Sequence, residues 1–278
     1  MLVTLCSTDI IWENKEANFK ELESLFSQFD FKPELIILPE MFTTGFTMDT
    51  SFAEPANGGV TLDWMRRIAS AMDAAVVGSF QVETRPASVE ISDFRKGKTV
   101  SNRLYFVCPD GSYEFYDKRH LFRMGEENRH YQPGSRRVIV EYKGVRFLLN
   151  ICYDLRFPVW TRNVDNEYDV IINVANFPAP RVKVIEPLCK ARAIENLSYM
   201  LFVNRTGADP VLGYLPSSHA IDFKGDDIGV DVAQDFASKC LFGGNLQVIN
   251  AEIDLDSLRR FRERFPAWMD GDNFVICD

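Results

Sequence analysis

Three polar residues of different chemistry each follow an apolar segment that has the composition of a buried strand. They are Glu40, Lys118 and Cys152. In enzymes built on sheets, ligands bind just beyond the strand ends, because the sheet is rigid and the loops there are free to vary. A carboxylate, an ammonium and a thiol that meet there would supply a base, an oxyanion stabiliser and a nucleophile. Each residue alone is more often a capping carboxylate, a surface cation or a packed cysteine, so their joint occurrence is what predicts catalysis.

Other kinds of site find little support in the sequence. The six cysteines include no C-x-x-C pair and the three histidines no H-E-x-x-H, so we expect neither a metal site nor a disulfide framework. The 31 Lys and Arg residues against 40 Asp and Glu give a net charge of −9, which disfavours nucleic-acid binding. The N-terminus has no basic leader before an apolar run, and no apolar run reaches about eighteen residues. We therefore expect a cytoplasmic protein that does not enter a membrane.

The chain of 278 residues, 46% of them hydrophobic, is long enough for one well-packed domain. Apolar runs and turn sequences predict strands over Leu2–Thr8, Leu35–Leu38, Ala74–Val82, Val100–Cys108, Tyr113–Tyr116, Val138–Glu141, Arg146–Ile151, Val170–Ala175, Tyr199–Asn204 and Leu246–Ile253. Apolar residues at helical spacing predict helices over Asn14–Phe29, Thr61–Met72, Pro158–Asn166, Val182–Glu195 and Leu255–Phe265. This mixture favours a layered α/β (α+β) fold of antiparallel sheet covered by helices. We expect a single domain over residues 1–278, with 255–278 as a C-terminal helix and tail.

The segments around the three polar residues resemble those of the carbon–nitrogen hydrolase, or nitrilase, superfamily. The similar segments are Leu38–Phe42, Tyr116–Phe122, Gly125–Glu127, Asn150–Pro158 and Ala191–Asn196. Their order and spacing look like the Glu–Lys–Cys triad of that family, and the resemblance runs over essentially the whole chain. It implies a four-layer α-β-β-α sandwich, usually paired as a homodimer, that uses neither a metal nor an organic cofactor.

Two further segments, Asn173–Arg181 and Phe261–Trp268, resemble the bacterial ω-amidase branch of the superfamily. This resemblance implies a cysteine-dependent amidohydrolase that releases ammonia from the terminal amide of a small carboxylate. The substrate would be 2-oxoglutaramate or 2-oxosuccinamate, and the intermediate a thioester acyl-enzyme. One departure is that Val184 and Ile185 replace an aromatic pair of that branch, which would reshape the pocket. Hydrolysis of deaminated glutathione, of an N-carbamoyl amide or of a nitrile stays open, as does a non-catalytic binding protein of the same fold.

Chemistry and the resemblance together suggest a role for each site residue. Only a few per cent of a free thiol is ionised at neutral pH, so Glu40 would take the proton of Cys152 as the sulfur attacks the amide. Lys118 stays charged and would stabilise the oxyanion. The resemblance adds the backbone N–H of Tyr153 as a second oxyanion donor. It also adds Glu127 as a second glutamate that holds the lysine and positions the substrate amide, with a solvated loop carboxylate as the alternative.

A substrate carboxylate would need a cationic partner. Arg156, shortly after the predicted nucleophile, is the first candidate, because guanidinium and carboxylate form a bidentate pair. Arg181 is the second, and an ordinary ion pair is the alternative for both. Phe177 belongs to the ω-amidase-like segment and is expected to contact the substrate. His120 and His130 are interpreted as packing or loop hydrogen-bonding residues.

Overall fold

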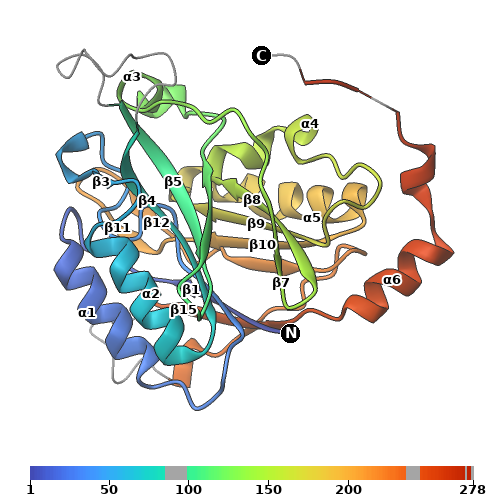
Figure 1. Cartoon of the computed structure of the whole chain (residues 1–278), viewed down its shortest axis with the longest axis horizontal. Coiled ribbons are helices and arrows are strands. Elements are labelled where there is room, and N and C mark those ends of the chain that lie inside the picture. The colour runs from blue at the N-terminus through green and yellow to red at the C-terminus, as the bar shows by residue number, and fades with distance from the viewer. Residues whose placement is uncertain (85–98, 236–244, 273, 277–278) are drawn as a thin grey trace.

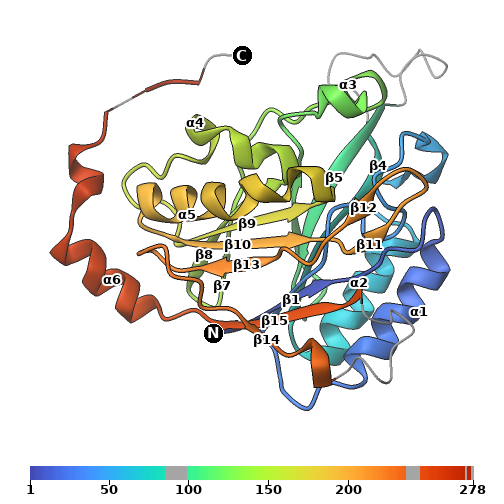
Figure 2. The same ribbon diagram turned by 180° about the vertical axis from the view of Figure 1, so that it is seen from behind.

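The computed structural model describes residues 1–84, 99–235, 245–272 and 274–276. In this part of the chain two β-sheets lie face to face, and helices cover the outer side of each (Figures 1 and 2). The larger sheet has the strand order β14-β15-β1-β2-β4-β5-β6, with β3 beside β4, and the smaller has the order β13-β10-β9-β8-β7. The expected four-layer α-β-β-α sandwich is confirmed.

The strands of the larger sheet are β1 (Leu2–Ser7), β2 (Leu35–Ile37), β3 (Glu54–Pro55), β4 (Ala75–Thr84), β5 (Thr99–Val107), β6 (Tyr113–Asp117), β14 (Val230–Asp231) and β15 (Gln247–Glu252). Those of the smaller sheet are β7 (Ile139–Tyr142), β8 (Val145–Ile151), β9 (Val170–Ala175), β10 (Tyr199–Asn204) and β13 (His219–Ile221). A separate hairpin consists of β11 (Gly207–Ala208) and β12 (Gly213–Tyr214). The helices are α1 (Lys15–Phe26), α2 (Val60–Met72), α3 (Glu127–His130), α4 (Pro158–Thr161), α5 (Ile185–Asn196) and α6 (Leu255–Arg264). Every predicted strand is present, and the unpredicted ones are too short to show a pattern.

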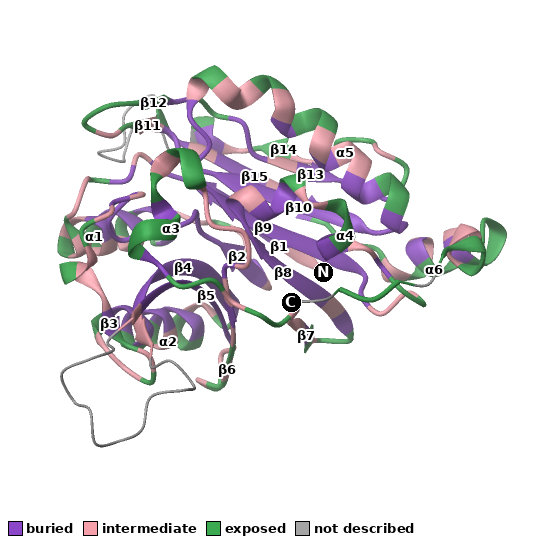
Figure 3. Ribbon diagram, turned by 90° about the horizontal axis from the view of Figure 1, so that it is seen from above, coloured by how far each residue is buried: buried purple, intermediate pink, exposed green. Residues whose placement is uncertain are grey.

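The central strands are buried on both faces (Figure 3). In β4, Val76 packs in the cluster beneath α1 and α2, whereas its neighbour Val77 packs in the core between the two sheets. Successive residues of a strand point to opposite faces, so a strand with two buried faces has a continuous apolar sequence. This is why runs of apolar residues located the strands.

The predicted antiparallel arrangement is wrong in the middle of both sheets. β1, β2 and β4 are parallel neighbours, and so are β8, β9 and β10. Helices α1, α2 and α5 lie between successive strands of these groups, and parallel pairing requires crossover connections of that length. The two predicted hairpins, β5–β6 and β7–β8, are antiparallel as expected.

Three helices differ from the prediction by three residues or more at one end. The side chain of Asn14 caps α1 as expected, but the helix ends at Phe26. α4 ends at Thr161, because Arg162 has an extended ψ of 126°. α5 starts later than predicted, because Ala179–Val184 forms a 3-10 helix. Within the described ranges, no helix has the length and apolar character needed to cross a membrane.

The predicted C-terminal helix is present as α6, and with a 3-10 helix over Ala267–Asp270 it leads the chain away from the two sheets (Figures 1 and 2). Leu258 is fully buried and packs in the larger hydrophobic core cluster. Arg262 donates hydrogen bonds to Asp169 Oδ1 and to the backbone oxygen of Tyr168, both at 2.8 Å. These contacts anchor α6 to the smaller sheet.

Candidate active site

The three residues singled out in the sequence meet in the structure. Lys118 Nζ donates a hydrogen bond to Glu40 Oε1 at 2.8 Å, and both side chains are fully buried. Cys152 is 8% exposed and lies near enough to both for its thiol pKa to respond to their charges. The ends of β2, β6 and β8 therefore bring a carboxylate, an ammonium and a thiol together.

Glu127 completes this arrangement from the first turn of α3. Lys118 Nζ lies 3.0 Å from its Oε1 and 2.9 Å from its Oε2. The backbone N–H of Phe122 also donates to Oε2, at 2.6 Å. Because Glu127 is fully buried, it is not the solvated loop carboxylate considered as its alternative. Lys118 is held between two carboxylates.

Two asparagines that the sequence did not single out hold Glu40. Asn102 Nδ2 donates to Glu40 Oε1 at 2.8 Å, and the backbone N–H of Asn176 donates to Oε2 at 2.9 Å. Asn176 Nδ2 also donates to the backbone oxygen of Glu40 at 2.5 Å. The only available signals were a polar residue inside the apolar strand predicted at Val100–Cys108 and another directly after Val170–Ala175.

Cys152 directly follows β8 and is the first residue of the 3-10 helix Cys152–Arg156, where the chain turns sharply. Its φ of +47° is in the left-handed region, which is unfavourable for a residue with a side chain. The fully buried carboxylate of Asp154 accepts a hydrogen bond from the backbone N–H of Ile151 at 2.9 Å. This contact holds the turn that presents the thiol.

His120 has the packing and hydrogen-bonding role that the sequence suggested. Its Nδ1 lies 2.7 Å from Asp154 Oδ1, and its ring stacks on Phe157 with the centroids 3.7 Å apart. His130 is exposed at the end of α3. Among the described residues, no three His, Cys, Asp or Glu side chains are grouped to hold a metal ion.

The electrostatics of the cluster favour a protonated thiol beside a charged lysine. Burial raises the pKa of Cys152 well above its usual value, and the charge of Glu40 adds to this while Lys118 opposes it. Burial alone would lower the pKa of Lys118, but Glu127 and Glu40 outweigh it and raise that pKa well above its usual value. Burial also raises the pKa of Glu127, which Lys118 lowers and Glu40 raises further. The thiol therefore needs a base before it can act as a nucleophile.

A pocket of about 560 Å³ opens onto Cys152. The four predicted substrate-binding residues, Tyr153, Arg156, Phe177 and Arg181, all line it. The guanidinium of Arg181 lies over the ring of Phe122, 4.5 Å from its centroid, while Arg156 is exposed. The other described residues that line the pocket at Cys152 are Trp12, Phe46, Met48, Phe122, Met124, Gly125, Asn176, Pro178, Asp209, Pro210, Val211, Leu212 and Tyr214.

The Trp12 and β11–β12 side of the pocket was not predicted, because no motif marks it. The hydroxyl of Tyr214 donates to Asp209 Oδ2 at 2.6 Å, which ties the two ends of this hairpin together. Val184 and Ile185, the departure noted in the sequence, are not among the pocket-lining residues. Ile185 is fully buried in the core, so the replacement does not place either side chain in the pocket.

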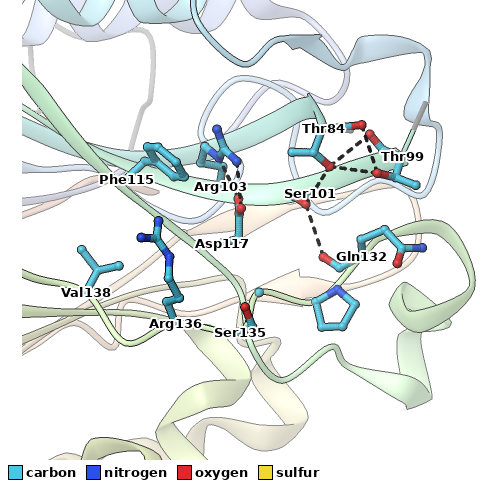
Figure 4. Close-up of a pocket in the computed structure, with 12 residues that line it drawn as sticks. Thr84, Thr99, Ser101, Arg103, Phe115, Asp117, Gln132, Ser135, Arg136 and Val138 are labelled. Carbon is cyan, nitrogen blue, oxygen red and sulfur yellow. Dashed lines mark hydrogen bonds and ion pairs between the residues drawn. The ribbon is translucent and has the colours of Figure 1, made fainter. Parts of the chain in front are cut away.

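A second pocket, of about 320 Å³, lies along β4, β5 and β6 and contains none of the clustered residues (Figure 4). Arg103 donates to both oxygens of Asp117, at 2.7 and 2.8 Å. The hydroxyl of Thr84 lies 3.0 Å from that of Thr99 and 3.3 Å from that of Ser101 (Figure 4). These polar groups partner one another, and none of the described residues that line this pocket is a cysteine. The pocket at Cys152 is therefore the candidate active site.

Comparison with protein families and sequences agrees with this arrangement. The family model for carbon-nitrogen hydrolases matches residues 2–263. The chain is 39% identical over 275 residues to Omega-amidase YafV of Escherichia coli (strain K12), covering 99% of this chain and 98% of the relative. It is 28% identical over 266 residues to 2-oxoglutaramate amidase of Bacillus subtilis (strain 168), covering 94% of each.

Solved structures show the same fold. XC1258 from Xanthomonas campestris, described as a CN-hydrolase superfamily protein with an arsenic adduct in its active site, superposes with a TM-score of 0.86. It is 35% identical, and the match covers 100% of this chain and 99% of that one. Nit3 of Saccharomyces cerevisiae, a nitrilase-superfamily member, matches with a TM-score of 0.78 at 20% identity, covering 96% and 94%.

Proposed function

The chain belongs to the carbon–nitrogen hydrolase family and is an amidohydrolase, and on that premise we propose that it is a cysteine-dependent ω-amidase. The proposed reaction releases ammonia from the terminal amide of 2-oxoglutaramate or 2-oxosuccinamate. The observation that carries the proposal is that one pocket joins Cys152, beside the buried carboxylates and lysine, to two arginines, Arg156 and Arg181. The names of the E. coli and B. subtilis relatives support the substrate class.

In the first half of the reaction, Glu40 accepts the proton of Cys152 as the sulfur attacks the amide carbon. The C=O electron pair moves onto oxygen, and Lys118 Nζ stabilises the resulting oxyanion together with the backbone N–H of Tyr153. Loss of one such donor typically costs about 3–4 kcal/mol of transition-state stabilisation. When the C–N bond breaks, Glu40 gives its proton to the departing nitrogen. Ammonia leaves, and the acyl group remains on sulfur as a thioester.

The second half repeats these proton transfers with water. Glu40, again unprotonated, takes a proton from a water molecule that attacks the thioester carbon. The same two donors stabilise the second oxyanion. The C–S bond then breaks, the proton on Glu40 returns to Cys152, and the carboxylic acid is released. The raised thiol pKa of Cys152 supports this order, since the resting enzyme holds a thiol rather than a thiolate.

Glu127 would act through Lys118. Both of its oxygens accept from Lys118 Nζ, so it fixes the direction in which the ammonium points. Its burial removes competing water, and an ion pair in such surroundings is far less screened than one at the surface. We propose that it also positions the amide group of the substrate.

The substrate carboxylate would bind the arginines of the pocket. Arg156 is proposed as the first partner and Arg181 as the second, because a guanidinium forms paired hydrogen bonds with a carboxylate. The guanidinium of Arg181 lies over the ring of Phe122, and its Nη1 lies 3.9 Å from Met124 Sδ, so both contacts hold it at the pocket. Phe177 is 4% exposed and would contact the carbon chain of the substrate.

A panel of substrates tests the proposal. Purified enzyme is assayed for ammonia from 2-oxoglutaramate, 2-oxosuccinamate, a neutral primary amide of the same length, a nitrile and an N-carbamoyl amino acid. We expect the two 2-oxo acid amides to have the highest kcat/KM. A clear preference for the nitrile or for the N-carbamoyl compound would assign a different reaction of the family, and no turnover of any of them would favour the non-catalytic alternative.

We also propose that the enzyme is a homodimer. The support is a set of exposed apolar side chains on α4, α5 and the C-terminal segment: Val159, Ile194, Phe265 and Met269. Stable interfaces bury about 1,600 Å² in total and have an apolar centre. Light scattering after size-exclusion chromatography should give twice the 31.8 kDa chain mass, and a monomer at micromolar concentration would contradict the proposal.

We further propose that residues 1–278 are one domain that works in the reducing cytoplasm. Both sheets contribute to one hydrophobic core, so the chain should unfold in a single cooperative step. A free catalytic thiol is best preserved in a reducing compartment. Calorimetry tests whether the chain is one domain, since two separate transitions would contradict it. Cell fractionation tests whether the protein is cytoplasmic.

A further inference from the structure

Asn102 contacts both carboxylates of the buried cluster with one amide nitrogen. Its Nδ2 lies 2.8 Å from Glu40 Oε1 and 3.2 Å from Glu127 Oε1, and the side chain is fully buried. An amide nitrogen has two N–H groups, so each carboxylate receives one. The opposite orientation of the amide would place its oxygen against two negatively charged groups, so the two acceptors fix the direction of this side chain.

The backbone of Asn102 is also part of the site. Its carbonyl oxygen accepts a hydrogen bond from the backbone N–H of Lys118 at 3.0 Å. β5 therefore holds the backbone of Lys118 and, through one side chain, both carboxylates that Lys118 Nζ contacts. A substitution of the side chain leaves the backbone contact in place, so the two effects can be separated by experiment.

The charges of the cluster do not balance by themselves. Glu40 and Glu127 carry two negative charges against the single positive charge of Lys118, and all three side chains are fully buried. Two carboxylates that share a buried site hold one proton more tightly than isolated carboxylates do. If that proton lay on Glu40, this carboxylate could not accept the proton of Cys152. Asn102 adds two N–H donors to the carboxylates without adding charge.

We propose that Asn102 is a positioning residue that keeps both carboxylates of this cluster unprotonated at neutral pH, so that Glu40 begins each cycle ready to accept the proton of Cys152. The inference rests on the proposed role of Glu40 as the base. In the described part of the chain, the titratable groups that interact with the two carboxylates from the surrounding elements are Lys118, Cys152, Tyr131 and Tyr214. Both tyrosine hydroxyls donate elsewhere, Tyr131 to the backbone oxygen of Thr47 and Tyr214 to Asp209. Asn102 is thus the uncharged side chain that bridges the two carboxylates.

The chain offers a matched control in Gln81. It faces Asn102 across the antiparallel β4–β5 pair, and it is also buried, at 2% exposure. In the described part of the chain, neither amide atom of Gln81 has a hydrogen-bond partner. Replacing such an amide by an apolar group of similar shape leaves no new unpaired group behind. Gln81→Met therefore changes the same strand pair without removing a hydrogen bond to either carboxylate.

The test is the pH profile of kcat/KM for Asn102→Leu, Asn102→Ser and Gln81→Met. For Asn102→Leu we expect the acid limb to move up by at least about one pH unit, which is a tenfold loss at a fixed pH on that limb. Activity should recover toward the wild-type plateau at alkaline pH, and KM there should stay within about twofold. Asn102→Ser keeps one donor and should shift less, and Gln81→Met should follow the wild-type profile.

Two results would overturn the inference. One is an Asn102→Leu profile of wild-type shape with a uniformly lower plateau, which would mean that Asn102 only supports the fold. The other is a wild-type profile in both Asn102 variants. If Asn102→Leu does not fold by circular dichroism, the same comparison is made with Asn102→Ser. Glu40→Gln separates this inference from the proposed function: near-normal turnover in that variant removes Glu40 as the base, whereas loss of turnover with an unshifted Asn102→Leu profile removes only the role of Asn102.

Discussion

The hydroxyl of Tyr116 donates a 2.8 Å hydrogen bond to Asp154 Oδ2, and this contact joins the end of β6 to the turn that presents Cys152. Asp154 also accepts from the backbone N–H groups of Ile151, at 2.9 Å, and His120, at 3.1 Å. One buried carboxylate therefore holds the turn of the proposed nucleophile against the segment that follows the proposed oxyanion stabiliser. The distance between the thiol and the ammonium depends on this carboxylate.

Asp154→Asn should lower kcat by about 100-fold, because a displacement of about 1 Å at a reacting group has an effect of that size. The amide has one acceptor oxygen in place of two, so its NH₂ group would face an N–H or O–H donor. KM should change little, since Asp154 is fully buried and is not a pocket-lining residue. Steady-state kinetics with circular dichroism as a folding check measure this. The control is Asp110→Asn, at an exposed position in the β5–β6 turn. An unaltered kcat for Asp154→Asn would contradict the proposal that Asp154 holds the turn of Cys152 in place.

Cys152→Ala should abolish ammonia release while the protein stays folded. The matched control is Cys108→Ala, a half-buried thiol at the end of β5 that lies outside the pocket. Near-normal turnover by Cys152→Ala would remove the assignment of the nucleophile.

Alkylation by iodoacetamide at pH 7 followed by mass spectrometry should modify Cys152 before the fully buried Cys6 and Cys189. Equal modification of all three would argue against a site open to small reagents.

Arg156→Ala should raise KM far more for a carboxylate-bearing amide than for a neutral amide of the same length. A hydrogen bond to a charged group contributes about 1.5–3 kcal/mol, which corresponds to a change of roughly 10–150-fold. Arg156→Lys keeps the charge but not the paired geometry, so it should fall between the wild type and Arg156→Ala. Arg181→Ala is measured in parallel to rank the two arginines. For either arginine, an equal effect of its replacement on the carboxylate-bearing and the neutral amide would show that this arginine does not bind the carboxylate.

The triad was predictable because each member lies just beyond the end of a predicted strand and within a distinctive local segment. Glu40, Lys118 and Cys152 could therefore be identified without knowing which strands are neighbours. Asn102 and Asn176 could not, because their roles depend on contacts between segments far apart in the sequence. Asn102 lies within β5 and Asn176 directly follows β9, and asparagine is also frequent in ordinary turns, so the local sequence does not indicate either role.

The direction of the strands was missed for a related reason. Alternation and apolar runs show where a strand lies and how many of its faces are buried, but they do not identify its neighbours. β1 pairs with β2, the next strand, but also with β15, near the other end of the chain. Hairpins were predicted correctly because their turns are local, whereas the parallel pairs depend on how α1, α2 and α5 pack across the sheets.

Asp169→Asn should destabilise the protein in a pH-dependent way. Burial raises the pKa of Asp169, but hydrogen bonds from Arg146 and the charges of Arg146 and Arg262 outweigh it, so its pKa in the folded protein is lowered. A carboxyl with a lowered folded pKa stabilises the fold above its unfolded pKa, and this stability is lost as the pH falls through the folded value.

At pH 7, Asp169→Asn leaves the buried guanidinium of Arg262 without its counter-charge, and breaking such a pair typically costs about 3 kcal/mol. Urea unfolding should show this loss at pH 7. The difference from the wild type should narrow as the pH falls from about 4, the pKa of the carboxyl in the unfolded chain, through the lowered pKa of Asp169 in the folded protein. Asp63→Asn is the control, because its ion pair with Arg66 is exposed and should contribute less than about 1 kcal/mol. A difference between Asp169→Asn and the wild type that stays constant with pH would show that packing, and not the charge of Asp169, anchors α6.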